Sequence, residues 1–134
     1  MRVTFVSNYM NHHQQPFSEA MRARLGEDYT FIQTQPMEKE RVQMGWDTSA
    51  QSLSFVRKFW EQEETCRQLI MDSDVVIFGW TGMEELIVPR LQAGRLTFRN
   101  SERIYKEGQW KAISPRGLRQ KYRDYIQYRR KPYY

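Results

Sequence analysis

The fold is decided by Asp74-Val75-Val76-Ile77-Phe78-Gly79. Four consecutive apolar residues, three of them β-branched, are typical of a strand that is covered on both faces of a parallel sheet. The glycine ends the run. We therefore predict a buried strand here and read the rest of the chain outward from it.

A helix is expected on each side of this strand. After it, Thr81-x-x-Glu84 has the pattern of a capping box, and apolar residues recur at helical spacing up to Gly94, with Pro89 as a kink. Before it, residues 53–71 fit either one long helix or a strand at 55–60 followed by a helix at 63–71. We favour the strand and helix.

The beginning of the chain repeats the pattern of strand, loop and helix. Residues 2–7 form a β-rich run, a polar loop follows from Asn8 to Gln15, and Pro16 suits a first helical position. Phe17, Ala20, Met21 and Leu25 lie at helical spacing before Gly26. A second strand is predicted at residues 29–33, and residues 34–52 are expected to form a long irregular connection.

The end of the chain predicts a fifth strand at residues 96–99 and a last helix that Ser114-Pro115 opens. This helix carries a coherent face, which we expect to dock on the sheet with the arginines outside. That face consists of Leu118, Tyr122, Tyr125 and Ile126. The closing Pro132-Tyr133-Tyr134 resembles the start of another strand rather than a polar tail, which suggests that the chain is a fragment.

These elements predict an α/β fold, a Rossmann-like doubly wound parallel sheet in three α/β/α layers, formed by residues 1–134 as one domain. In the strand order 3-2-1-4-5, the topology reverses between strands 1 and 4. Ligands bind beyond the carboxyl ends of strands at such a point. The loops from Asn8 to Gln15 and from Gly79 to Met83 are therefore expected to line a crevice.

Composition indicates the number of domains, the cellular compartment and the charge of the partner. The 134 residues are enough for one domain, and the single Cys66 excludes a disulfide framework and favours a reducing, cytoplasmic compartment. No apolar run is long enough to span a membrane. Residues 1–94 carry 9 Lys and Arg against 13 Asp and Glu, whereas residues 95–134 carry 12 against 3. The basic C-terminal third is expected to face an anionic partner.

Four segments together resemble bacterial glycosyltransferases that build capsular and exopolysaccharide. They are Asn11-His12-His13-Gln14-Gln15-Pro16-Phe17, the 74–79 strand, Thr97-Phe98-Arg99-Asn100-Ser101-Glu102-Arg103 and Arg130-Lys131-Pro132-Tyr133-Tyr134. The resemblance is to the N-terminal half of enzymes with two Rossmann-like domains, the GT-B architecture. It implies that this domain holds the glycan acceptor and that a C-terminal domain, missing here, binds the nucleotide-sugar donor. No other cofactor is expected.

The loop after the first strand supplies the candidate catalytic residue. A histidine with its ordinary pKa near ~6.5 can accept a proton from an attacking sugar hydroxyl. The resemblance favours His13 for this role, with Asn11, His12 and Gln14 binding substrate. The alternative is an exposed loop histidine without function. A metal site is disfavoured because adjacent side chains diverge and no third histidine is present.

Two further segments lie at the same predicted edge. Trp80 could stack on a sugar ring, and Thr81 could bind substrate, although capping alone would account for Thr81. The glycines nearby match neither a dinucleotide-binding fingerprint nor a P-loop. Arg99, Glu102 and Arg103 could bind a pyrophosphate or an acidic sugar, with a surface ion pair as the alternative.

The favoured function is the acceptor-binding domain of a glycosyltransferase. The alternative is a non-enzymatic basic module that binds nucleic acid or another anionic partner, and a flavodoxin-like carrier ranks last. Nucleic acid is disfavoured because the apolar face of the last helix is expected to pack on the sheet. Arg119, Lys121, Arg123, Arg129 and Arg130 are instead expected to approach the anionic inner face of the plasma membrane.

Overall fold

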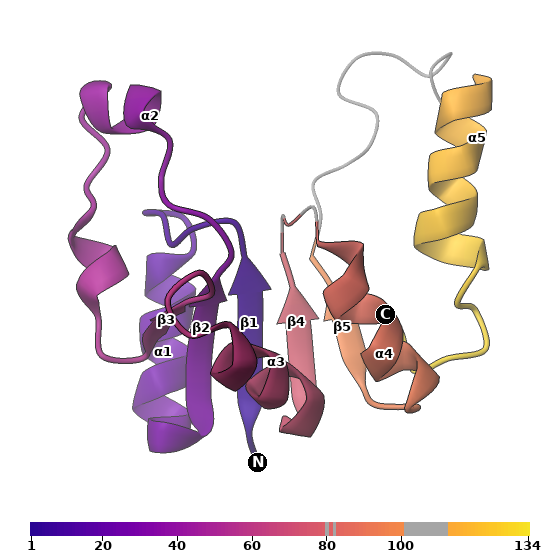
Figure 1. The fold of residues 1–134 in the computed structure, drawn as a ribbon, viewed down its shortest axis with the longest axis horizontal. Helices are drawn as coiled ribbons and strands as arrows, with labels where there is room; N and C mark the ends of the chain where they lie inside the picture. The colour runs from indigo at the N-terminus through magenta and orange to yellow at the C-terminus, as the bar shows by residue number, and fades with distance from the viewer. Residues whose placement is uncertain (80, 82, 101–112) are drawn as a thin grey trace.

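The computed structural model describes residues 1–79, 81, 83–100 and 113–134. Its centre is a parallel sheet of five strands in the order β3-β2-β1-β4-β5, which confirms the predicted fold and strand order (Figure 1). The strands are β1 (Val3–Ser7), β2 (Tyr29–Gln33), β3 (Val56–Lys58), β4 (Val75–Phe78) and β5 (Thr97–Arg99). The strand at 55–60 that we favoured over one long helix is therefore present, in shortened form.

Helices lie on both faces of the sheet, as the doubly wound topology requires. The helix α1 (Gln15–Leu25) packs on the face that carries Phe5 and Phe31. The helices α3 (Glu63–Asp72) and α4 (Glu84–Gln92) cover the face that carries Val6 and Ile32. Successive residues of β1 thus point into two separate cores, because side chains alternate across a strand.

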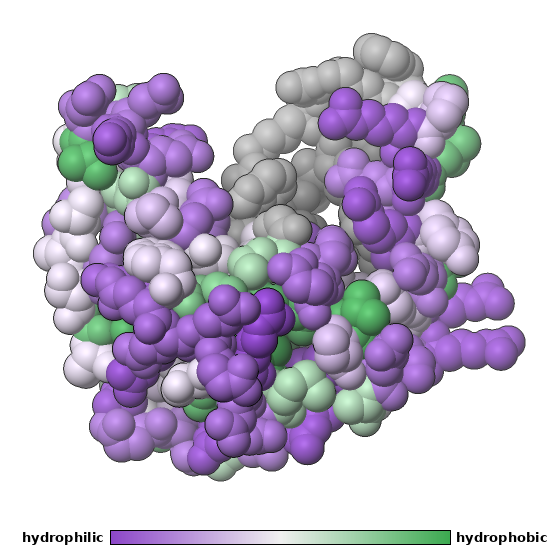
Figure 2. Space-filling model, viewed as in Figure 1, coloured by the Kyte–Doolittle hydropathy of each residue, from purple (hydrophilic) through white to green (hydrophobic). Residues whose placement is uncertain are grey.

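The segment from Thr34 to Ser52 is not irregular throughout, which corrects the sequence prediction. It contains a short helix, α2 (Lys39–Gln43), and a 3₁₀ turn (Ser49–Ser52). Met37 and Ala50 are buried and anchor the segment to the rest of the molecule. In between, the chain projects beyond the sheet as a largely hydrophilic lobe, here called the α2 lobe (residues 34–52) (Figure 2).

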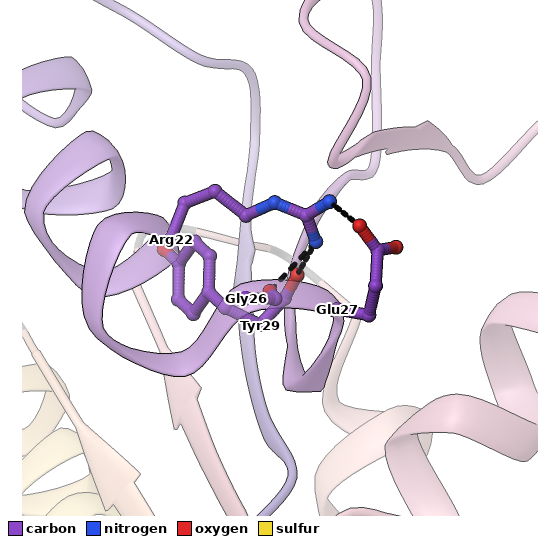
Figure 3. Close-up of polar contacts among 4 residues, drawn as sticks. All are labelled: Arg22, Gly26, Glu27 and Tyr29. Carbon is purple, nitrogen blue, oxygen red and sulfur yellow. Dashed lines mark hydrogen bonds and ion pairs between the residues drawn. The ribbon is translucent and has the colours of Figure 1, made fainter.

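Helix α1 is joined to β2 by a tight turn that Arg22 stabilises. Its guanidinium donates to the carbonyls of Gly26 (2.7 Å) and Tyr29 (3.3 Å) and pairs with the Glu27 carboxylate (Figure 3). Gly26 has a φ of 56°, a left-handed conformation that suits a glycine at a helix end. The predicted helix end is therefore confirmed.

The buried side of α1 differs from the prediction. Ser18 is completely buried, whereas Phe17 is 45% exposed and Ala20 is exposed. Ser18 lies inside because its hydroxyl accepts a hydrogen bond from the phenol of the buried Tyr29 at 2.9 Å. The predicted face is otherwise present in part, because the Phe17 ring meets that of Phe5 with centroids 5.8 Å apart and Met21 and Leu25 pack against the core.

Helix α4 does not begin with the predicted capping box. It starts at Glu84 after Met83, and the Thr81 hydroxyl accepts a 3.3 Å hydrogen bond from the backbone N–H of Met83. The Glu84 carboxylate lies 3.8 Å from Arg99 at the end of β5, so it is engaged by an arginine rather than by the helix end. Helix α4 continues through Pro89.

The last helix begins as predicted but does not pack as predicted. Ser114 caps α5 (Pro115–Lys121) by accepting from the N–H of Gly117 at 3.1 Å, and one π-helical turn (Tyr122–Ile126) continues it. Leu118, Tyr122 and Ile126 remain about half exposed, at 53%, 56% and 49%. The expectation that this face docks on the sheet is therefore wrong for these three residues. The side chain of Tyr125 lies outside the described residues.

The last residues of the chain pair with β5, as the predicted start of a further strand would. The backbone N–H of Thr97 donates to the Pro132 carbonyl at 2.9 Å, and the Tyr134 N–H donates to the Thr97 carbonyl at 3.0 Å. Arg99 adds a bond to the Tyr134 carbonyl at 2.6 Å. The chain end thus lies parallel to β5 on the side away from β4.

The side chain of Arg90 is completely buried between α3, β4 and β5. Its guanidinium donates to five backbone carbonyls, those of Ile70 (2.7 Å), Met71 (3.4 Å), Ser73 (2.7 Å), Asp74 (3.1 Å) and Leu96 (2.7 Å). Burial lowers the pKa of Arg90 to about 10, so the group stays cationic at neutral pH. It satisfies carbonyls at the end of α3, which no helical N–H can reach.

Replacing Arg90 by methionine is expected to lower the free energy of unfolding by about 3–5 kcal/mol, because buried carbonyls lose their donors. Urea denaturation would measure the change. Arg24→Met, on the exposed side of α1, serves as the control and is expected to stay within about 0.5 kcal/mol. A loss for Arg90→Met as small as that of the control would contradict the role given to Arg90.

Stability is expected to fall as the pH rises from 9 to 12. Burial raises the pKa of Cys66 from 9.0 to about 11 and that of Tyr29 from 10.0 to about 12. Both groups therefore lose their protons in the unfolded chain first, which favours unfolding by about 1–3 kcal/mol at pH 10.5. The lowered pKa of Arg90 acts in the opposite direction above about pH 10 and offsets part of this loss. Urea denaturation at pH 8 and pH 10.5 measures the loss, and Cys66→Ala should reduce it. Equal stability at the two pH values would contradict the prediction.

Candidate functional site

The candidate site lies at the carboxyl edge of the sheet, between β1 and β4. These central strands are neighbours from which the chain runs outward in opposite directions, so their ends form the topological switch point. The loop after β1 leads to α1, and the turn after β4 leads to α4. Both loops that the sequence pointed to therefore start at this edge.

Gly79 allows β1 and β4 to remain close at this edge. Its N–H donates to the Val6 carbonyl at 2.7 Å. A Cβ at this position would lie 2.9 Å from the Ser7 hydroxyl and 3.1 Å from the Phe5 ring, closer than real contacts allow. Any larger residue would push Ser7 or Phe5 aside, so glycine is required by space.

A group of uncharged polar side chains, here called the edge cluster, gathers at this point. It comprises Ser7, Asn8, Gln14, Gln33, Thr34 and Thr81. Gln33 is included because it lies opposite Ser7 in the register of β1 and β2. Gln14 Nε2 donates to Ser7 Oγ at 3.0 Å, and Ser7 Oγ donates to Asn8 Oδ1 at 3.2 Å. The hydroxyls of Thr34 and Thr81 lie 3.4 Å apart and connect the end of β2 to the turn after β4.

Two amide groups of the edge cluster have unused hydrogen-bonding capacity. Gln33 is completely buried, and its Oε1 accepts from the Met10 N–H at 3.5 Å. Within the described part of the chain, Gln33 Nε2 and Gln14 Oε1 are buried without a hydrogen-bond partner. One donor group and one acceptor of the edge cluster thus remain unpartnered within the described residues.

The loop that precedes α1 is shaped by Asn11. Its Oδ1 accepts hydrogen bonds from the backbone N–H groups of His13 (3.0 Å) and Gln14 (3.2 Å). The carboxamide oxygen is therefore committed to the turn, which is a structural role for Asn11. The same turn sets the position of Gln14, whose side chain reaches into the edge cluster.

The two histidines lie on the outside of this loop. His12 and His13 are both exposed, with ring centroids 3.9 Å apart. His12 meets the edge of Trp46 from the α2 lobe at 4.7 Å, and the Arg41 guanidinium lies over the Trp46 ring at 4.7 Å. The His12 ring, the Trp46 indole and the Arg41 guanidinium thus form one contact series, here called the aromatic series.

The predicted site residues fall into three groups. Asn11, His12, His13, Gln14 and Thr81 lie on the two loops of the switch point. Arg99, at the end of β5, pairs with Glu84, as the ion-pair alternative anticipated. Trp80, Glu102 and Arg103 lie outside the described residues, so their predicted roles stay predictions.

The sequence reasoning missed Gln33, Thr34, Arg41 and Trp46. Gln33 is the last residue of the second predicted strand, and Thr34 follows it. The rule that placed the crevice at the strand ends could therefore have included both residues. The position of Trp46 could not be predicted in this way, because residues 34–52 show no clear pattern of strand or helix. Its place beside His12 depends on the α2 lobe, which no local pattern predicted.

The described residues contain no group of three histidine, cysteine or acidic side chains that could hold a metal ion. Cys66 is buried in the core between the sheet and α3, away from the edge cluster. Comparisons with protein-family models, with curated proteins and with solved structures find no match to this chain.

Removing the Asn11 side chain is expected to loosen the loop. Asn11→Ala should lower the free energy of unfolding by about 1 kcal/mol, because two backbone N–H groups lose their acceptor. Asn11→Asp keeps the oxygen and should lose less than half of that amount. Chemical denaturation measures both variants. Equal losses for the two would show that the carboxamide oxygen does not hold the turn.

Proposed function

We propose that this chain is the acceptor-binding domain of a glycosyltransferase of the GT-B kind. In this proposal the enzyme moves a sugar from a nucleotide-sugar donor to a polysaccharide or lipid-linked glycan. The observation that carries the proposal is the uncharged edge cluster at the switch point. The resemblance of the 11–17, 74–79, 97–103 and 130–134 segments to such enzymes points the same way.

The chemistry of the edge cluster suits a neutral, hydroxyl-rich ligand. Each sugar hydroxyl both donates and accepts a hydrogen bond, and amides and hydroxyls are complementary to that pattern. Gln33 Nε2 and Gln14 Oε1 offer one donor and one acceptor in the same cluster. A phosphate or carboxylate would instead call for cations, and the six residues of the cluster carry no charge.

The aromatic series of His12, Trp46 and Arg41 supports the same assignment. Trp46 is half-buried and offers aromatic surface of the kind on which sugar rings pack. His13, on the exposed loop, is proposed as the base that accepts the proton of the attacking acceptor hydroxyl. A second, C-terminal domain would bind the donor, and no further cofactor is proposed.

A basic binding module remains the second candidate. Arg116, Arg119, Arg129 and Arg130 are exposed, and they belong to a segment where cations outnumber acids. Such a module would bind an anionic partner through phosphate contacts, and its affinity would fall steeply with added salt. A cytoplasmic location belongs to the proposal; none of the described helices is long and apolar enough to cross a membrane.

The test is an NMR titration of the ¹⁵N-labelled chain with neutral oligosaccharides of several linkages. Amide shifts are expected at residues 7–14, 33, 34 and 81. Gln14→Ala should weaken binding about tenfold, which corresponds to the loss of one hydrogen bond. Gln92→Ala, an exposed glutamine at the end of α4, is the matched control and should bind like the parent chain.

Three results would count against the proposal. Shifts confined to the basic residues beyond position 113 would favour the basic module. Saturable shifts at the edge cluster with a mononucleotide alone would assign this edge to a donor. Turnover of nucleotide sugars by this chain alone would contradict the assignment of the donor site to a second domain.

A further inference from the structure

The last helix leaves its apolar side in solvent. Leu118, Tyr122 and Ile126 are each about half exposed, and Ile113 just before the helix is 73% exposed. In Figure 1 this helix stands beside the β5 edge of the sheet, and Figure 2 shows green apolar surface among purple side chains along it. An exposed apolar stripe of this kind marks a contact surface.

The spacing of the stripe makes the helix amphipathic. Positions 118, 122 and 126 follow one another at intervals of four, so they lie on one side of the helix. Arg119 and Arg123 each follow a stripe residue by one position, about 100° further around the helix. Lys121 precedes Tyr122 and flanks the stripe on its other side. Cations therefore border the apolar stripe on both sides.

The surrounding charge is strongly one-sided. Residues 113–131 contain seven lysines and arginines and a single acid, Asp124. Arg116, Arg119, Arg129, Arg130 and Lys131 are all exposed. The helix has an N-terminal cap, because Ser114 Oγ accepts a hydrogen bond from the N–H of Gly117 at 3.1 Å. The first turn of the helix is therefore capped by a residue of this chain.

We propose that the helix at residues 115–126, with the basic turn that follows it, lies on an anionic lipid surface, with Leu118, Tyr122 and Ile126 facing the acyl chains. Apolar residues that enter the boundary and cations that meet lipid headgroups are the two parts of such a helix. Nucleic acid would use the cations but leave the apolar stripe in water. The proposal depends on this segment alone and not on the edge cluster.

The proposal is tested by co-sedimentation of the chain with vesicles. Binding is expected to phosphatidylcholine vesicles that contain phosphatidylglycerol, to weaken with added salt, and to be far weaker on pure phosphatidylcholine. The triple variant Arg116→Gln, Arg119→Gln, Arg129→Gln should bind about a hundredfold more weakly, at about fivefold per charge. Leu118→Ser with Ile126→Ser should also weaken binding at least tenfold.

Control variants distinguish the effect of the helix from that of cations and apolar groups elsewhere on the surface. Arg24→Gln with Arg57→Gln removes exposed cations elsewhere, and Val42→Ser with Met44→Ser removes exposed apolar groups elsewhere. Both pairs should bind like the parent chain. Circular dichroism melts check that every variant stays folded.

A polarity-sensitive fluorophore reports how deeply a labelled residue enters the lipid surface. A label on Leu118→Cys should shift to the blue on anionic vesicles, whereas a label on Arg116→Cys should not. Binding that depends on the arginines but not on the stripe, with no blue shift, would overturn the proposal. So would tight binding of single-stranded RNA that the serine variants leave unchanged, which would assign the segment to nucleic acid.

Discussion

The guanidinium of Arg90 is the contact on which the arrangement of α3, β4 and β5 depends (Figure 1). It joins the end of α3, the turn into β4 and the residue before β5 through five backbone carbonyls. A buried cation is tolerable when its donors are matched, and here both terminal nitrogens of the guanidinium are matched, whereas the buried Nε has no partner among the described residues. Arg90 thus fixes β4 and β5 at their amino ends, and backbone hydrogen bonds from Gly79 to Val6 and from Arg99 to Tyr134 hold their carboxyl ends.

The strands were predictable because burial on both faces leaves a simple signal in the sequence. β2 has the predicted bounds, and β1, β4 and β5 differ from the prediction by a residue or two. The helices were less predictable, because their inner faces depend on partners far along the chain. Ser18 is buried by Tyr29, and Glu84 is drawn to Arg99, and neither pairing can be read from helical spacing.

The candidate site shows the same division between local pattern and long-range contact. The rule for switch points located the two loops and hence Gln14 and Thr81. It did not reveal that Gln33 completes the cluster from β2, or that Trp46 reaches His12 from a lobe with a helix of only five residues. The apolar stripe of the last helix was found, but its period is the same for a helix that faces a sheet and for one that faces solvent. Only the structure separates those two cases.

The pairing of residues 132–134 with β5 covers the outer side of that strand. Thr97 donates to Pro132 and accepts from Tyr134, so the outward backbone groups of β5 are already occupied within the molecule. An open parallel edge would be a template for another chain, and long unpaired edges invite aggregation. Here Tyr133 and Tyr134 lie along the outer side of β5, while β3 is the edge strand on the opposite side of the sheet. A change at Tyr133 or Tyr134 would therefore expose the backbone of β5 and act first on self-association, well away from the edge cluster.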